Sequence, residues 1–295
     1  MTMKEEGYVP VSGGRVWYWK AGSHAKGIPL VVVHGGPGAS HDYLEPLEAF
    51  ASERPVVFYD QLGCGNSDRP DDNSLWVIER FVDELHQIRE ALGLGQVHLL
   101  GQSWGASLVA EYMLTKQPVG VAGLLLAGPL LSTSRWMEDQ RKWVSDLPVN
   151  VQEIIRRTED SGDFASKEYQ EAMMVFYGRH VCRMEQWPEC LNRTFEKLNL
   201  SQYLHMWGPS EFTVTGTLKT FELADRLGEL KLPVLITCGQ FDEARPETCR
   251  YFQSLVPGAE LHVFEDASHE HHLEKPDEFL AVAGNFFRKA EQNTL

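Results

Sequence analysis

Residues 97–114 read VHLLGQSWGASLVAEYML, and this stretch decides the fold. An apolar run, Val97–Leu100, leads into the pentapeptide GQSWG (residues 101–105), and a helical pattern follows over Ala106–Leu114. The pentapeptide matches G-x-S-x-G, a motif that places a serine on a sharp turn between a strand and a helix. Such a turn leaves room only for very small residues two positions before and after the serine. The pattern therefore predicts a strand–turn–helix unit that presents Ser103 as a nucleophile.

Short apolar runs alternate with longer amphipathic segments on both sides of this unit. We expect strands at Arg15–Lys20, Pro29–His34, Pro55–Asp60, Val97–Gly101, Val121–Ala127, Pro233–Gly239 and Glu260–Phe264. Apolar spacing by three and four predicts helices at Trp76–Leu92, Ser103–Gln117 and Pro276–Lys289. Several strands lack polar alternation, as is typical of strands buried on both faces of a parallel sheet. The fold class is therefore predicted to be α/β, with a mainly parallel central sheet flanked by helices.

The alternation stops between about Leu131 and Ala224. This segment is rich in Trp, Met, Glu and Arg and contains no convincing buried strand, so we expect several short helices there. The alternation resumes with the apolar run Leu232–Gly239, which favours an insertion between two strands of one sheet. We predict a core formed by residues 1–130 and 226–295, with a helical cap formed by residues 131–225.

Composition excludes several classes of protein. The chain has 295 residues, of which 43% are hydrophobic, so it can bury a large core and is not intrinsically disordered. Its net charge of −15, without any basic block, argues against a nucleic-acid partner. The longest apolar stretch, Val119–Leu131, is interrupted by Gly and Pro and is too short to span a bilayer, so we expect no membrane partner.

The five cysteines are scattered and form no CxxC pair (Cys64, Cys182, Cys190, Cys238 and Cys249). Reduced thiols in a cytosol are the simplest explanation of this pattern. Residues 1–10 carry charges and lack the apolar core of a signal peptide. We therefore expect a cytoplasmic protein.

A nucleophilic serine needs a base, and the base needs an orienting acid. Asp242 follows the expected strand Pro233–Gly239, and His269 follows the expected strand Glu260–Phe264. Both lie at carboxyl ends of strands, where open α/β sheets place their ligands. The order serine, acid, histidine along the chain is also that of the α/β hydrolases. We predict a triad of Ser103, Asp242 and His269.

Other residues compete for these roles. Asp266 lies three residues before His269 on the same segment, and Asp225 lies at the end of the insertion, so both are weaker candidates for the acid. His271 and His272 compete with His269, and together with Glu270 they could suggest a metal site. However, no second cluster has the spacing of known ligand sets. We expect no metal and no cofactor, with His271 and His272 in a loop or at a helix start.

The glycine-rich segment HGGPG (residues 34–38) follows the expected strand Pro29–His34. Backbone N–H groups in such a loop can point to a reacting carbonyl oxygen, and Trp104, directly after the serine, would supply a second donor. No phosphate-binding loop motif is present. An oxyanion hole is therefore expected beside Ser103.

Five segments together resemble the proline iminopeptidase (prolyl aminopeptidase) family. They are HGGPG (34–38), DQLGCGNS (60–67), GQSWG (101–105), GPSEF (208–212) and GQFDE (239–243). They occur in the family's order and spacing over about residues 10–290. The resemblance implies an α/β-hydrolase fold with a helical cap inserted after Val121–Ala127. It also implies a serine exopeptidase that releases one N-terminal residue, often proline, without metal or cofactor.

The resemblance also assigns roles to individual residues. Ser103, Asp242 and His269 match the family's triad, and Gly36 and Trp104 match its oxyanion donors. Glu211 and Glu243 match the glutamates that hold the free α-ammonium of the substrate. A cation bound beside two carboxylates would fix the substrate's N-terminus, so that only one residue fits between it and the serine.

The expected substrate is a short peptide or an amino-acid amide with a free N-terminal amine. An amino-acid amidase would use the same residues, whereas a carboxylesterase or lipase would not need the two glutamates, and a non-enzymatic ligand receptor remains a further alternative. Five aromatic residues of the cap either line a pocket for the first side chain or form cap core (Trp136, Trp143, Tyr177, Tyr203 and Trp207). The oligomeric state and the preferred N-terminal residue stay open.

Overall fold

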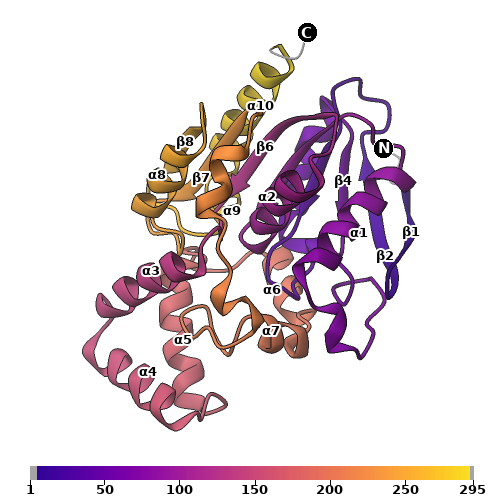
Figure 1. The fold of residues 1–295 in the computed structure, drawn as a ribbon. Helices are drawn as coiled ribbons and strands as arrows, with labels where there is room; N and C mark the ends of the chain where they lie inside the picture. The colour runs from indigo at the N-terminus through magenta and orange to yellow at the C-terminus, as the bar shows by residue number, and fades with distance from the viewer. Residues whose placement is uncertain (1–4, 293–295) are drawn as a thin grey trace.

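The computed structural model describes residues 5–292 and is built around one eight-stranded sheet (Figure 1). The spatial order of the strands is β1-β2-β4-β3-β5-β6-β7-β8. Their bounds are β1 Glu5–Val11, β2 Gly14–Ala21, β3 Leu30–Val33, β4 Val56–Tyr59, β5 Val97–Gln102, β6 Val121–Ala127, β7 Val234–Gly239 and β8 Glu260–Phe264. β1 pairs antiparallel with β2, and β2 pairs antiparallel with β4, whereas β3 to β8 are joined by parallel pairing. The predicted α/β class with a mainly parallel sheet is confirmed.

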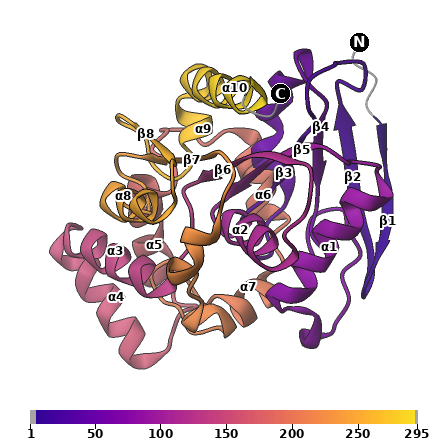
Figure 2. The same ribbon diagram turned by 45° about the horizontal axis from the view of Figure 1, so that its top comes forward.

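Helices cover both faces of the sheet (Figure 2). α1 (Ile78–Ala91), α2 (Trp104–Lys116) and α8 (Pro246–Leu255) share one apolar core with the strands. The 3₁₀ helix η1 (His41–Ser52) and α10 (Pro276–Gln292) share a second core on the other face. Successive residues of the inner strands alternate between these two cores, because side chains of a strand point to opposite faces. This double burial explains why the sequence of the strands shows no polar alternation.

Between β6 and β7 the chain leaves the sheet and forms mostly helices. They are α3 Thr133–Ser145, α4 Val149–Ser161, α5 Lys167–His180, α6 Glu189–Glu196, α7 Leu200–Met206 and the 3₁₀ helices η3 Thr217–Thr220 and η4 Ala224–Glu229. α3, α4 and α5 pack around an apolar cluster of their own that includes Ile155, Phe176 and Phe212. In Figure 1 these helices lie at one end of the sheet. The division of the chain at residues 131 and 225 stays a prediction.

The seven expected strands agree with the structure to within one residue at each end. The sequence did not predict β1, η1, α8 or the short helices η2 (Asn73–Leu75) and α9 (His271–Glu274). β1 reads EEGYVPV and is mostly exposed at the edge of the sheet, so it lacks the apolar run of an inner strand. Within the described part of the chain, no helix is both long enough and apolar enough to cross a bilayer.

Close backbone packing at the turn between β5 and α2 requires two glycines. A Cβ atom on Gly105 would lie 2.2 Å from the carbonyl oxygen of Val33, and one on Gly101 would lie 2.3 Å from that of Gly105. Ser103 between them has φ 56° and ψ −120°, a conformation that is rare for any residue except glycine. The turn therefore holds Ser103 in a strained conformation at the carboxyl end of a central strand, as the sequence motif predicts.

This packing predicts that Gly105→Ala destabilises the fold. The new methyl group can be accommodated only if β3 and α2 move apart, so we expect a loss of at least about 3 kcal/mol in the free energy of unfolding. Gly178→Ala is the matched control, because a Cβ atom added to Gly178 in α5 would meet no neighbouring atom within 4 Å. That change should stabilise the protein by roughly 0.5–1 kcal/mol. Urea unfolding measures both variants, and equal stability of the two would contradict the steric argument.

Candidate active site

Asp242 and His269 lie in direct contact behind Ser103. His269 Nδ1 is 2.7 Å from Asp242 Oδ1. Asp242 also accepts backbone hydrogen bonds from Gly239 (3.0 Å) and Ala244 (2.9 Å), which fix its carboxylate in the loop after β7. Because a carboxylate accepts, the proton of this pair lies on Nδ1, and Nε2 of the ring lies 3.9 Å from Glu243 Oε2.

Electrostatics reinforces this contact. Burial by itself raises the pKa of Asp242, but the charge of His269 and its hydrogen bond outweigh burial and hold the pKa well below its usual range. Burial likewise lowers the pKa of His269, yet the neighbouring Asp242 outweighs it and raises the pKa above its usual value. The pair therefore stabilises a positive charge on the imidazole ring, which is what a base needs after it accepts a proton.

Ser103 and His269 line the same cavity. Among the described residues, no hydrogen bond joins the Ser103 hydroxyl to the His269 ring. Such bonds often close only when a substrate is bound. The Ser103 backbone N–H donates to the carbonyl of Ala127 (2.9 Å), which ties the turn to β6.

The competing residues take other places. The exposed Asp266 has φ 55°, and its backbone N–H donates to the side chain of Gln240. His271 Nε2 contacts the Thr237 hydroxyl (2.9 Å), and His272 Nε2 contacts the Tyr43 carbonyl (3.0 Å). His271 and His272 begin α9, so the expected position at a helix start agrees with the structure, although both side chains are buried.

Within residues 5–292, atoms that could ligate a metal converge at His41, Asp42 and Glu45. Cations of the chain already occupy this cluster. Arg193 contacts both carboxylates, and Lys197 Nζ lies 2.7 Å from Asp42 Oδ1. These contacts join α6 to η1 and explain the cluster as a structural link between the insertion and the core.

The loop of residues 34–38 lies beside Ser103, and Gln61 connects it to the serine turn. Gln61 Oε1 accepts from Trp104 Nε1 (3.0 Å), and Gln61 Nε2 donates to the His34 carbonyl (2.8 Å). Gly36 lines the cavity, and Trp104 begins α2, where backbone N–H groups have no acceptor within the helix. Gln61 belongs to the segment DQLGCGNS, whose sequence pattern alone assigned it no positioning role.

A cavity of about 450 Å³ lies above the serine, between the core and the insertion. Gly36, Ser103 and His269 line it from the core. Tyr177, Tyr203 and several apolar side chains line it from the insertion, and three of these are also partly exposed to solvent (Met174, Phe195 and Leu200). The cavity therefore combines an apolar wall with a small number of polar groups, as small-molecule sites commonly do.

Glu211 and Glu243 both line this cavity, Glu211 from the insertion and Glu243 from the loop after β7. Glu243 is buried and Glu211 is partly buried. Glu211 Oε1 accepts from the Tyr203 hydroxyl (2.5 Å), whereas Glu243 Oε1 has no hydrogen-bond partner. Burial raises the pKa of both carboxyls, and the charge of Glu211 raises the pKa of Glu243 further. A bound cation would offset both effects, so this part of the cavity favours a positively charged ligand group.

The first helix of the insertion holds the loop that carries Asp242 and Glu243. Trp143 Nε1 donates to the Asp242 carbonyl (2.8 Å), and Gln140 Nε2 donates to the Glu243 carbonyl (3.0 Å). Of the five aromatic residues that the sequence singles out in the insertion, Tyr177 and Tyr203 line the cavity. Trp136 packs its edge against His269 with ring centroids 5.7 Å apart.

Tyr43 and Glu270 are among the cavity side chains to which sequence reasoning gave no role in binding or catalysis. The Tyr43 hydroxyl accepts from the Gly35 N–H (2.7 Å) and donates to Gln102 Oε1 (2.6 Å). Nothing in the sequence around Tyr43 points to this contact, because η1 is distant along the chain from β5. Glu270 directly follows His269, and this position next to a predicted catalytic residue was the one feature of the sequence that could have indicated it.

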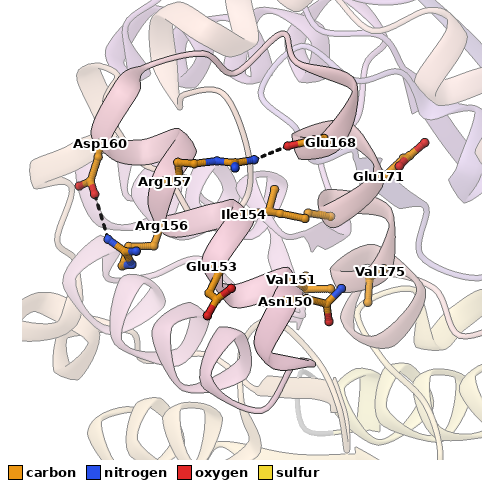
Figure 3. A pocket seen from close by; sticks show the side chains of 11 residues that line it. Asn150, Val151, Glu153, Ile154, Arg156, Arg157, Asp160, Glu168, Glu171 and Val175 are labelled. Atoms are coloured by element: carbon orange, nitrogen blue, oxygen red, sulfur yellow. Dashed lines mark hydrogen bonds and ion pairs between the residues drawn. The ribbon is translucent and has the colours of Figure 1, made fainter.

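A larger hollow of about 670 Å³ lies on the surface between α4 and α5 (Figure 3). Two ion pairs join its charged side chains, Arg157 with Glu168 and Arg156 with Asp160. It contains none of the predicted site residues. We therefore assign the chemistry to the smaller cavity above Ser103.

Comparisons with known proteins agree with this geometry. A family model described as alpha/beta hydrolase fold matches residues 28–276. The chain is 48% identical to a proline iminopeptidase of Heyndrickxia coagulans, over 96% of this chain and 99% of that protein. It is 38% identical to a proline iminopeptidase of Lactobacillus acidophilus, over 94% and 96%.

Solved structures give the same result. The crystal structure of a proline iminopeptidase from Mycobacterium smegmatis is similar with a TM-score of 0.92 and 35% identity, over 99% of this chain and 100% of that chain. The crystal structure of VinJ is similar with a TM-score of 0.93 and 36% identity, over 97% and 99%. An esterase from Rhodococcus sp. has a TM-score of 0.69 at 21% identity, over 98% and 99%, and shares the fold.

The geometry predicts that a fluorophosphonate probe labels the protein on Ser103. Ser103→Ala should abolish labelling, and Asp242→Asn should slow it by at least about 100-fold, because the base loses its orienting acid. Ser107→Ala is the matched control, since its hydroxyl is buried in α2 and donates to the Leu130 carbonyl. Intact-protein mass spectrometry measures the labelling, and a labelled Ser103→Ala protein would contradict the assignment.

Proposed function

Because this chain belongs to the proline iminopeptidase family of the α/β hydrolase fold, we propose that it is a serine aminopeptidase of short peptides. It releases one N-terminal residue, with proline as the expected residue. The observation that carries this proposal is the pair of carboxyls Glu211 and Glu243, which lines the same cavity as Ser103 and His269. A cytoplasmic location stays a prediction.

We assign the chemical steps to the predicted triad. The Ser103 oxygen attacks the carbonyl carbon of the N-terminal residue, and its proton passes to His269 Nε2. The carbonyl oxygen becomes an oxyanion, which accepts hydrogen bonds from the backbone N–H groups of Gly36 and Trp104. When the C–N bond breaks, His269 returns its proton to the leaving amine. Asp242 holds the imidazole in the correct tautomer throughout.

A water molecule then completes the reaction. It gives a proton to His269 and attacks the acyl–Ser103 ester through a second oxyanion. Collapse of that intermediate breaks the bond to Ser103, which recovers its proton from His269. The products are the free amino acid and the shortened peptide, and no metal or cofactor takes part.

Glu211 and Glu243 would select the free amine. The α-ammonium of the substrate is a cation, and it would bind beside these two carboxyls. Burial and the repulsion between the carboxylates raise their pKa values, and a bound cation would offset both effects. An esterase that acts on simple acyl groups has no use for this pair. An amino-acid amidase would use it in the same way, and would differ in the size of its preferred leaving group.

The proposal is tested with proline anilide, a Pro-Ala dipeptide, their N-acetylated forms and a short acyl ester. We expect hydrolysis of the free-amine compounds, with kcat/KM at least about 100-fold lower for the acetylated ones, because acetylation removes the cation. Equal rates on free and acetylated compounds would contradict an aminopeptidase and favour an esterase.

The role of Glu211 gives a second expectation. Glu211→Gln should lower kcat/KM for free-amine substrates by about 10- to 100-fold, which corresponds to a charged hydrogen bond of about 1.5–3 kcal/mol. Hydrolysis of the acyl ester should change little. Glu171→Gln is the matched control, because Glu171 lies in α5 outside the cavity. A loss of ester hydrolysis in parallel with the loss of peptide hydrolysis would refute this role.

A further inference from the structure

Glu270 is a third carboxyl of the cavity, and the proposed mechanism does not use it. The residue is 5% exposed and lines the cavity together with Tyr43, Val181 and Leu191. Its Oε2 atom has no hydrogen-bond partner. A buried polar atom without a partner is costly to a folded protein, so its presence in a ligand cavity points to a ligand group.

The surroundings of Glu270 differ from those of the α-ammonium site. Its backbone N–H donates to the Val181 carbonyl (2.9 Å), directly after α5. Glu211, in contrast, contacts Tyr203 of α7. The cavity therefore carries carboxyls both from the insertion and from the loop after β8, and the charge of His269 influences both of them. The wall around Glu270 also carries the apolar side chains Val181 and Leu191, against which the methylene groups of a long side chain can pack.

A neighbouring histidine shows which protonation state the resting site favours. His272 Nε2 lies 3.0 Å from the Tyr43 carbonyl, so that nitrogen carries the ring proton. His272 Nδ1 is then an acceptor, and it lies 3.6 Å from Glu270 Oε2. Two acceptors that face each other favour a proton on the carboxyl. Burial lowers the pKa of His272 to about 3, so this ring does not supply a charge of its own.

The electrostatics of the cavity agree with a neutral Glu270. Its pKa is raised to about 8, mainly by burial, and the charge of His269 opposes that increase. The carboxyls of Glu274, Asp242 and Glu211 contribute to the raised pKa. Glu243 and the phenol of Tyr43 are the other titratable groups that the Glu270 charge influences. Four neighbouring carboxyls face one imidazole here, so an ionised Glu270 would add a further negative charge that only a bound cation could balance.

We propose that Glu270 is a specificity-determining residue that binds a second cationic group of the substrate, on a lysine-like or arginine-like side chain. This inference rests on the proposed aminopeptidase function. The side chain belongs either to the N-terminal residue or to the residue after it. Glu270 releases its proton to solvent when the cation binds, and an ion pair replaces the carboxylic acid. No covalent bond between heavy atoms changes.

Because Glu270 must release a proton, binding of the cationic side chain should become stronger as the pH rises. At pH 7 a carboxyl with a pKa of about 8 must give up a proton to pair with the cation, which weakens binding by about tenfold. At pH 9 the carboxyl is already ionised and this cost disappears. The preference for the cationic substrate should therefore rise about tenfold from pH 7 to pH 9.

The experiment uses two matched pairs of dipeptide amides and the full-length protein. One pair is Pro-Lys-amide and Pro-norleucine-amide, and the other is Lys-Ala-amide and norleucine-Ala-amide. Norleucine has a side chain of similar length without the cation. We expect one lysine member to exceed its partner in kcat/KM by at least about tenfold at pH 9, and the pair that shows this identifies the residue that Glu270 contacts. The α-amine titrates alike within a pair, so its effect cancels in the ratio.

Two variants distinguish a loss of cation binding at Glu270 from a general disturbance of the structure. In Glu270→Gln the lysine-to-norleucine ratio should be near one at both pH values, whatever the absolute rate. Glu274→Gln should keep the ratio at pH 9, because Glu274 is bonded to the Ser268 hydroxyl and the Arg183 backbone and does not line the cavity. The rise of the ratio between pH 7 and pH 9 should become smaller in this variant, because the Glu274 charge contributes to the raised pKa of Glu270. A ratio near one in both pairs of the unmodified protein, or a ratio that Glu270→Gln leaves unchanged, would overturn the proposal. If none of the four amides loses its N-terminal residue, the aminopeptidase function itself fails.

Discussion

The close approach of three backbone segments at the turn between β5 and α2 is the constraint on which the site depends. Gly101 and Gly105 have no side chains, so the first turn of α2 can pack directly against β3 and β5. This contact accompanies the unusual backbone angles of Ser103, which lines the cavity. Because β5 lies between β3 and β6, the loops after neighbouring strands meet around the serine. A nucleophile on an edge strand would lack half of these neighbours.

The insertion completes this edge of the sheet in two ways. α3 holds the loop after β7 through the side chains of Trp143 and Gln140, so the positions of Asp242 and Glu243 depend on the insertion as much as on the core. The insertion also encloses the carboxyls and removes water from around them, which raises the pKa of Glu211 and Glu243. The same acids on an open surface would be ordinary solvated side chains. The preference of the cavity for a cation is therefore a product of burial.

The inner strands could be predicted because parallel strands covered on both faces need continuous apolar runs, as in Val31–Val33. β1 and α8 were missed for the opposite reason, since each keeps one face in solvent and has a mixed sequence. The predicted triad and Glu243 come together because the order of the strands brings their carboxyl ends to one edge, whereas the insertion brings Glu211 to the same cavity. The roles of these residues stay predictions that the proposed experiments address.

The sequence by itself determined the strand–turn–helix unit, the order of the serine, acid and histidine, and the positions of two glutamates that resemble an amine-binding pair. These features depend on local spacing and on a recognisable set of motifs. Only the tertiary structure decided which side chains share the cavity. Glu270 follows His269 in the chain, but its burial, its unpartnered oxygen and the acceptor of His272 beside it come from η1, α5 and α9 packing together. Spacing along the chain cannot show this, because protonation and desolvation depend on neighbours that are distant in sequence.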